Sequence, residues 1–329
     1  MVPGFRDLST RQLARPRKKT EGLSESDTAT AITQAPVRGG VLLLDKPTGI
    51  TSNAAVQRVR GLYSRVKAGH TGTLDPLASG LLPVCLGEAT KFSHPLLDAR
   101  KSYRATLRLG WRSSTGDAEG ELIESGRPEF TASQLREAVD ALTGEIEQVP
   151  PMYSALKVGG RPLYSLARKG VSVERSPRRV RIYQFEVLNW AGDSVEIHVN
   201  CSKGTYVRVL GEDLGALLGC GAYLTALRRV GIGSLDVAEA VGFETLESAS
   251  MHERLAMLKP PDRLLEDLPE VRLDDAEGKR LCNGLTVSGC IGVAPLQRAR
   301  IYAADGRFLG LGEVDQAGVL KPKRLVSSR

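Results

Sequence analysis

The sequence predicts a mixed α+β domain, built on a largely antiparallel sheet with flanking helices, followed by a small β-rich C-terminal domain. Apolar and polar residues alternate at 103–109 and at 195–200, which is typical of strands with one covered face. Between these runs, apolar residues recur at helical spacing. The last 65 or so residues instead contain short strand-like runs and glycine-rich turns. Helices mixed with alternating strands favour an α+β architecture.

The elements follow in order along the chain. Residues 1–38 are polar and lack a sustained apolar period, so we expect a flexible basic and polar tail. A buried strand is predicted at 41–44, and Thr51 or Ser52 caps a helix that runs to about Tyr63. The remaining predictions are a helix capped by Thr131 and ended by Gly144, a strand at 180–188, a helix from Tyr206 to about Leu218, and a linker at Lys259–Pro261.

Composition limits the class of protein. The chain has 329 residues, enough for about two domains and a large core. Hydrophobic residues at 41% and charged residues at 25% exclude wholesale disorder. No uncharged apolar run approaches the ~20 residues of a membrane helix, so we expect a soluble cytoplasmic protein that does not bind membranes.

Cysteine and histidine usage gives no sign of a metal site. The five cysteines are scattered, no two form a CxxC pair, and the four histidines lack the paired spacing of ligands. We therefore expect reduced thiols, no metal and no cofactor.

The positive charge is concentrated in one segment, residues 153–183. The chain has 45 Lys and Arg against 38 Asp and Glu, a net charge of +7. The segment alone has eight basic residues against Glu174, which is 8 − 1 = +7, and includes Tyr153, Tyr164 and Tyr183. Basic residues interleaved with aromatic ones favour contact with nucleic acid, although a solvated charged face has the same composition.

The segment with the most unusual composition is the glycine-rich stretch 69–82, which contains Asp75 followed by Pro76. One interpretation is structural: Asp75 is the N-cap of a helix that begins with proline. The other is chemical, because glycines let a backbone approach a ligand closely and a carboxylate there can be a nucleophile or base. The stretch has neither GxGxxG nor the P-loop lysine, which argues against nucleotide binding.

This stretch resembles the catalytic loop of the TruB family, the bacterial tRNA pseudouridine-55 synthases. The family pattern GHxGxLDPxAxGxLP is matched from Gly69 to Pro83. Further family motifs follow the family order over roughly residues 40–245: Asp45–Gly49, Leu86–Lys91, Lys101–Tyr103, Pro150–Lys157, Gly204–Arg208 and Tyr223–Arg229. The resemblance implies the pseudouridine synthase fold, with a catalytic domain at 39–258 and a PUA-like RNA-binding domain at 262–329.

The resemblance also implies an activity and a set of site residues. The family isomerises one uridine of the tRNA TΨC loop by breaking its N1–C1′ bond and rejoining the base through C5, on a flipped-out nucleotide and without metal or cofactor. Whether the aspartate attacks the sugar, adds to the base or abstracts a sugar proton stays open. We expect Arg208 to pair with Asp75 and to lower its pKa. The implied catalytic residues are Asp75, Tyr103 and Arg208, and the implied substrate-binding residues are His70, Lys46, Lys91, Tyr206 and Leu227.

Two other functions compete with the isomerase. A tRNA-binding or folding chaperone would use the same basic surface, but a pure binder needs no carboxylate that faces RNA. An enzyme for a small phosphorylated metabolite would explain the glycine-rich loop but not residues 153–183. The expected partner is the T-arm stem-loop of tRNA, and the expected state is a monomer.

Overall fold

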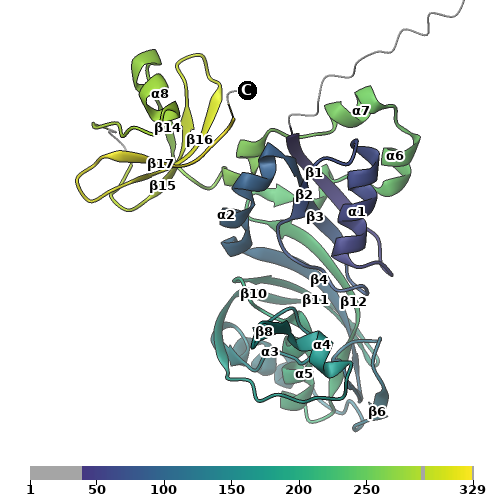
Figure 1. Ribbon diagram of the computed structural model, residues 1–329. Helices are drawn as coiled ribbons and strands as arrows, with labels where there is room; N and C mark the ends of the chain where they lie inside the picture. The colour runs from purple at the N-terminus through teal and green to yellow at the C-terminus, as the bar shows by residue number, and fades with distance from the viewer. Residues whose placement is uncertain (1–38, 290–292, 328–329) are drawn as a thin grey trace, which may run out of the picture. The chain divides into compact units, whose positions relative to one another are not determined.

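The computed structural model describes residues 39–289 and 293–327 (Figure 1). The tail expected at 1–38 lies outside these residues. The described chain contains a nine-stranded mixed sheet in the order β1-β3-β12-β4-β11-β10-β7, with β2 paired to β3 and β13 paired to β12. Its strands are β1 Gly39–Lys46, β2 Ala68–His70, β3 Ser79–Gly87, β4 Lys101–Leu109, β7 Gly144–Gln148, β10 Arg178–Ala191, β11 Ser194–Cys201, β12 Ala222–Ile232 and β13 Leu235–Asp236.

Neighbouring strands of this sheet are antiparallel except β3 and β12. These two run parallel and pair Ser79 with Arg228 and Gly80 with Arg229. The predicted α+β class with a largely antiparallel sheet is therefore confirmed. The predicted strands at 103–109, 180–188 and 195–200 are confirmed as parts of β4, β10 and β11.

Helices α1, α3, α5 and α6 pack against this sheet through buried apolar residues, and two of them begin at the caps that the sequence indicates. The Thr51 side chain accepts a hydrogen bond from the Ala54 amide at the start of α1, and Thr131 forms a capping box with Gln134 before α3. The helices are α1 Ser52–Leu62, α2 Ser93–Asp98, α3 Ala132–Ala141, α4 Leu163–Ala167, α5 Val207–Leu217, α6 Phe243–Ser248, α7 Met251–Ala256 and α8 Asp275–Cys282, with 3-10 turns at Glu88–Phe92, Val237–Glu239 and Pro261–Leu265. Within the described stretches, every helix is too short or too polar to cross a membrane.

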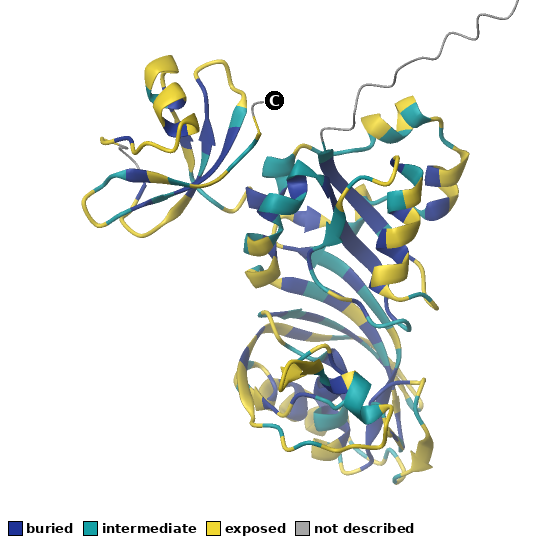
Figure 2. Cartoon of the chain, viewed as in Figure 1, coloured by how far each residue is buried: buried dark blue, intermediate teal, exposed yellow. Residues whose placement is uncertain are grey.

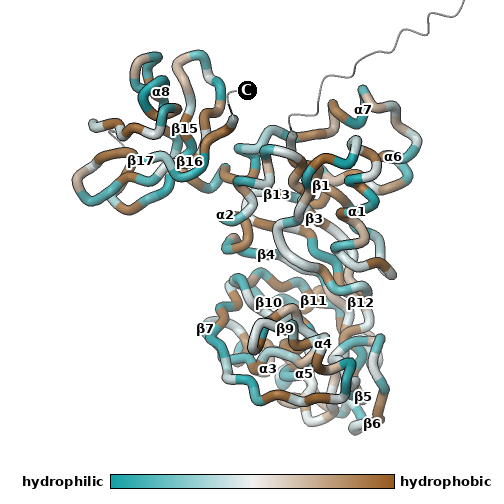
Figure 3. The backbone as a smooth tube through the Cα atoms, viewed as in Figure 1, coloured by the Kyte–Doolittle hydropathy of each residue, from teal (hydrophilic) through white to brown (hydrophobic). Residues whose placement is uncertain are grey.

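The hydrophobic core explains why these elements pack as they do. Strands β1 and β3 are rich in hydrophobic residues and buried along most of their length, whereas buried and less buried residues alternate along β4 and β11 (Figures 2 and 3). The buried face of α1, which carries Ala55, Val56 and Val59, packs in the same cluster as alternate residues of β4 and β11. This packing fixes the ends of the strands that hold the functional side chains.

The C-terminal part contains a second, four-stranded sheet in the order β14-β15-β16-β17, which confirms a β-rich C-terminal domain. It has its own core, in which Leu281 of α8 packs with strand residues such as Ile301. Its strands are β14 Glu270–Arg272, β15 Arg298–Tyr302, β16 Phe308–Val314 and β17 Leu320–Leu325, and two small hairpins elsewhere pair β5 Trp111–Ser113 with β6 Leu122–Glu124 and β8 Lys157–Val158 with β9 Arg161–Pro162.

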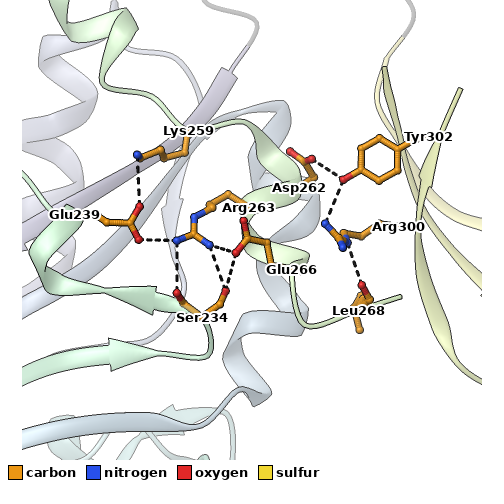
Figure 4. A network of polar contacts seen from close by, with 9 residues as sticks. All are labelled: Ser234, Glu239, Lys259, Asp262, Arg263, Glu266, Leu268, Arg300 and Tyr302. Atoms are coloured by element: carbon orange, nitrogen blue, oxygen red, sulfur yellow. Dashed lines mark hydrogen bonds and ion pairs between the residues drawn. The ribbon is translucent and has the colours of Figure 1, made fainter. Parts of the chain in front are cut away.

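The segment expected to be a linker, Lys259–Pro261, is packed against the first sheet. Lys259 exchanges two backbone hydrogen bonds of 2.8 Å with Val41, and the 3-10 turn that follows buries Leu264 and Leu265 in a hydrophobic cluster. A polar network continues from this turn (Figure 4). Arg263 is paired with Glu239 and Glu266, while the Tyr302 hydroxyl of β15 donates to Asp262 at 2.6 Å.

Candidate active site

Asp75 lies in the loop between β2 and β3 (Figure 1). The N-cap interpretation is wrong, because no helix follows: the Ala78 amide donates to the Asp75 carbonyl at 3.1 Å in a tight turn, and β3 begins at Ser79. The Asp75 side chain is 39% exposed, so its carboxylate is accessible to a ligand.

The first turn of α1 holds this loop in place. The Ser52 hydroxyl is buried, donates to the Leu74 carbonyl at 2.9 Å and accepts from the Leu74 amide at 2.7 Å. The Gly49 amide donates to the Pro76 carbonyl at 2.8 Å. The residues on both sides of Asp75 are therefore fixed by hydrogen bonds, which sets the direction of its carboxylate.

Arg208, in the first turn of α5, contacts Asp75 as expected. Its Nη2 atom lies 2.9 Å from Asp75 Oδ2, and its Nη1 atom lies 3.4 Å from Asp117 Oδ2. The guanidinium also donates to the carbonyls of Thr115 and Tyr153, both at 2.8 Å. Only 6% of the Arg208 side chain is exposed, so a buried cation with four partners orients the carboxylate of Asp75.

The electrostatics of Asp75 differ from the expectation. Burial raises the pKa of Asp75, the nearby Arg208 guanidinium and Lys46 act to lower it, and the Asp117 carboxylate adds to the rise. Arg208 therefore acts in the expected direction, but burial is the larger effect and the net direction is upward. The physical reason is that Arg208 is shared with a second carboxylate while the Asp75 carboxyl is partly withdrawn from water.

Tyr103 on β4 lies opposite Arg229 on β12. The Tyr103 side chain is almost fully buried, and burial raises its pKa. Arg229 is 1% exposed and donates from Nε to the Leu81 carbonyl at 2.8 Å and from Nη2 to the Gly72 carbonyl at 3.1 Å. It therefore ties β12 to both ends of the loop that carries Asp75.

Gly80 permits this close approach. Its φ angle is +98°, and a Cβ atom there would lie 2.3 Å from the Arg229 carbonyl oxygen. A glycine is required, because any other residue would collide with the backbone of β12 and would also be strained.

The predicted substrate-binding residues His70 and Lys46 occupy different positions relative to the pocket around Asp75. His70 lines the pocket around Asp75, and its Nδ1 atom accepts from the Gly72 amide at 3.3 Å. Burial and the adjacent Arg229 lower the pKa of His70, which favours the neutral ring. Lys46 is fully buried, and its Nζ atom donates to the carbonyls of Pro47 and Ile50, both at 2.8 Å. Burial lowers the pKa of Lys46 to about 8, so Lys46 supports the site from within and does not lie on the surface.

Of the other three predicted residues, Tyr206 and Leu227 reach the same pocket and Lys91 does not. Tyr206 and Leu227 line it, and the Tyr206 amide is held by Gln148 Oε1 at 3.0 Å. Lys91 instead donates to Glu88 at 2.7 Å and to the Ser327 hydroxyl at 2.9 Å. The structure does not bring Lys91 to the residues around Asp75.

The pocket has a volume of about 800 Å³ and is open to solvent. Asp75, Tyr103 and Arg208 lie on its wall. The basic segment 153–183 contributes four charged or aromatic side chains to the same wall: Tyr153, Lys157, Tyr164 and Arg168. A carboxylate, a tyrosine and cations around one cavity of this size are suited to a nucleotide whose phosphates lie at the mouth.

Comparison with known proteins identifies the family. The model for the TruB family pseudouridylate synthase (N terminal domain) matches residues 60–207, and the model for the tRNA pseudouridylate synthase B C-terminal domain matches residues 208–266. A third, for the pseudouridine synthase II TruB C-terminal region, matches residues 269–326. A protein of Aromatoleum aromaticum named tRNA pseudouridine synthase B is 55% identical over 295 residues, which cover 90% of this chain and 95% of the relative. The chain belongs to the TruB family.

Other relatives of this TruB family member agree. The protein of the same name from Dechloromonas aromatica is 50% identical over 287 residues, covering 87% of this chain and 95% of the relative. Among solved structures, a crystal structure of a Cbf5-Nop10-Gar1 complex contains a chain with a TM-score of 0.70 at 25% identity, covering 89% of this chain and 86% of that one. The expected fold and family are thus confirmed.

The sequence did not single out two residues of this site. Asp117 is 3% exposed in its side chain, and its pairing with Arg208 makes the cation a bridge between two carboxylates. A signal was present, because Asp117 stands between Gly116 and Gly120 in a short polar turn. Arg229 gave no comparable signal, because it stands next to Arg228 in a strand without a regular alternation of polar and apolar residues. In the described residues, His, Cys, Asp and Glu side chains form no group of three or more that would hold a metal ion.

Proposed function

We propose that this TruB family member isomerises uridine-55 in the TΨC loop of tRNA to pseudouridine. The observation that carries the proposal is the accessible Asp75 carboxylate, fixed by the buried Arg208 on the wall of a cavity of about 800 Å³. The relatives with 50% and 55% identity are named tRNA pseudouridine synthase B, and this supports tRNA as the substrate.

Asp75 is the catalytic carboxylate in this proposal. It acts in its ionised form, on the sugar or on the base of the flipped-out nucleotide. Arg208 orients the carboxylate and favours ionisation against the desolvation that raises its pKa. Tyr103, on the same wall, contacts the target base with its ring and hydroxyl.

The remaining wall binds the substrate. Leu227 and Tyr206 hold the base, and His70, with a ring that burial keeps neutral, occupies the space that the base leaves in the RNA loop. Extrusion of a loop nucleotide costs on the order of a few kcal/mol, which stacking and backbone contacts offset. Lys46 supports the Asp75 loop, whereas Lys91 is left without a role in binding the target nucleotide.

The domain roles complete the proposal. Residues 39–258 form the catalytic domain and residues 262–329 a PUA-like RNA-binding domain. The partner is the T-arm stem-loop of tRNA, and the protein acts as a monomer in the cytoplasm without metal or cofactor.

The test is product mapping on a tRNA transcript. Wild-type protein is incubated with unmodified tRNA, and pseudouridine is located by chemical derivatisation and primer extension. We expect one modified position, at uridine-55, and no product on a transcript that carries cytidine there. Product at another position, or none with folded protein, would contradict the proposal.

A further inference from the structure

Outside the pocket, two arginines and a tyrosine form a small exposed cluster. A lysine reaches the chain just before the first arginine through its ion pair with Asp98 at 2.8 Å. Arg100 precedes β4, Arg181 and Tyr183 lie on β10, and Lys203 follows β11. The Arg100 guanidinium carbon lies 4.0 Å from the centroid of the Tyr183 ring, and that of Arg181 lies 5.6 Å from it. We call these four residues the Tyr183 platform.

The backbone explains why Tyr183 is presented to solvent. The pairing of β10 with β11 shifts between Ile182 and Gln184, so Tyr183 is the extra residue of a bulge, and a bulge redirects a side chain. Tyr183 is 38% exposed although it lies in the middle of a long strand. Its ring supports the guanidinium of Arg100 through a cation–π contact.

The cations of the platform are available for a ligand. Among the residues that the structure describes, neither the Arg100 nor the Arg181 guanidinium has an ion pair or a side-chain hydrogen bond, although Glu145 lies across from Arg181 in the strand register. Lys203 is paired with Asp98 at 2.8 Å, so the platform and this carboxylate together carry a net charge of +2. A guanidinium that lies 4.0 Å over a ring and has free N–H groups can donate to the oxygens of a phosphate.

The platform adjoins the catalytic pocket. Lys101 and Ser202 line the pocket, and they are the chain neighbours of Arg100 and Lys203. Ser202 is also joined to Arg181 by two hydrogen bonds, from its amide to the Arg181 carbonyl at 2.8 Å and from the Arg181 amide to its hydroxyl at 2.9 Å. The backbone of the platform is therefore joined directly to the wall of the pocket.

We propose that the Tyr183 platform binds a phosphodiester group of the substrate RNA next to the flipped-out nucleotide. This proposal rests on the proposed function, because it requires an RNA substrate in the Asp75 pocket. Arg100 and Arg181 donate to the phosphate oxygens, and Tyr183 is a positioning residue that acts by holding Arg100. Such contacts set the register of the RNA and carry no base specificity.

The experiment measures the dissociation constant of unmodified tRNA over a range of salt concentrations. Arg100→Gln should weaken binding about tenfold and should reduce the salt slope by roughly 0.7–0.9, the value for one lost phosphate contact. Tyr183→Leu should weaken binding by a similar factor, whereas Tyr183→Phe should bind as wild type does. Because Tyr183 acts through Arg100, the double variant Arg100→Gln with Tyr183→Leu should bind only slightly more weakly than Arg100→Gln alone. Arg136→Gln, an exposed charge on α3, is the matched control.

The two proposals are separated by measuring single-turnover product in the same preparations. At saturating protein, every platform variant should form pseudouridine at the wild-type rate. Equal dissociation constants and salt slopes for Arg100→Gln and Arg136→Gln would overturn the platform proposal. A platform variant with unchanged affinity but a slower single-turnover rate at saturating protein would overturn it as well. Absence of product with wild-type protein would instead overturn the proposed function.

Discussion

Replacement of Arg208 by lysine tests how the site holds Asp75 ionised. Lysine keeps the positive charge but offers one ammonium group in place of a planar fork. Arg208 contacts two carboxylates and two carbonyls through both terminal nitrogens, and a single ammonium cannot reach all four. We expect the variant to keep the pairing with the fully buried Asp117 and to weaken the one with Asp75.

The magnitude follows from the geometry. Two unit charges about 4 Å apart interact by about 4 kcal/mol at an effective dielectric constant of 20, which corresponds to about three pKa units. The Asp75 side chain is 39% exposed, so solvent screens a large part of this interaction. We therefore expect the pKa of Asp75, already raised by burial, to rise further in the variant, by much less than the unscreened interaction alone would give.

The measurement is the single-turnover rate of pseudouridine formation between about pH 5 and pH 9. Because Asp75 must be ionised, the rate falls as the pH drops through its pKa. In Arg208→Lys this acid limb should move to higher pH, with a lower rate on the plateau because the carboxylate is less well oriented.

A control variant separates this effect from a general loss of stability. Arg263 is also a poorly exposed arginine with several partners, Glu239 and Glu266 among them, but it lies outside the pocket (Figure 4). Arg263→Lys should leave the acid limb in place. If Arg208→Lys shows a wild-type acid limb with only a lower plateau, the argument that Arg208 opposes the raised pKa of Asp75 is refuted.

Three further predictions concern the support of the site. Ser52→Ala leaves the buried amide and carbonyl of Leu74 without a partner and should lower the free energy of unfolding in urea by about 1–3 kcal/mol; a change below about 0.5 kcal/mol would count against the anchoring role. Gly80→Ala places a methyl group against the Arg229 carbonyl at positive φ and should cost about 2 kcal/mol or more in the same assay, so unchanged stability would contradict the close approach. Lys46 has a folded pKa of about 8 against an ordinary 10.5, so the unfolded chain holds more protons between these values. Wild type should therefore gain free energy of unfolding relative to Lys46→Met as the pH rises across this window. A stability difference that stays constant from pH 7.5 to 10 would contradict the burial of Lys46.

Local structure was predictable where a few neighbouring residues decide it. Thr51 and Thr131 mark helix starts because a side-chain oxygen satisfies a free amide, and the strands at 103–109 and 195–200 show the alternation of a half-buried sheet. The proline pair after Lys259 did not show that two leucines just beyond it are buried against the sheet. Proline fixes the backbone but does not show whether a segment is packed.

Part of the candidate site was predictable from the family resemblance, but its electrostatics were not. The motif around Asp75 and the pairing with Arg208 were expected from the family resemblance. The bridging role of Arg208 was not, because Asp117 comes to it from a distant turn through tertiary packing. The sign of the pKa shift of Asp75 depends on the balance of burial and two opposite charges, and this balance exists only in the folded chain.

The most direct test of the account is the release of tritium from tRNA labelled at C5 of uridine, with wild-type protein and with Asp75→Asn compared at saturating protein. The amide is nearly isosteric with the carboxylate but cannot act as nucleophile or base. We predict release by wild type, release at the background level by Asp75→Asn, and tRNA dissociation constants that agree within about threefold, a difference below 1 kcal/mol. Sustained release by Asp75→Asn would contradict the central claim that this carboxylate performs the chemistry.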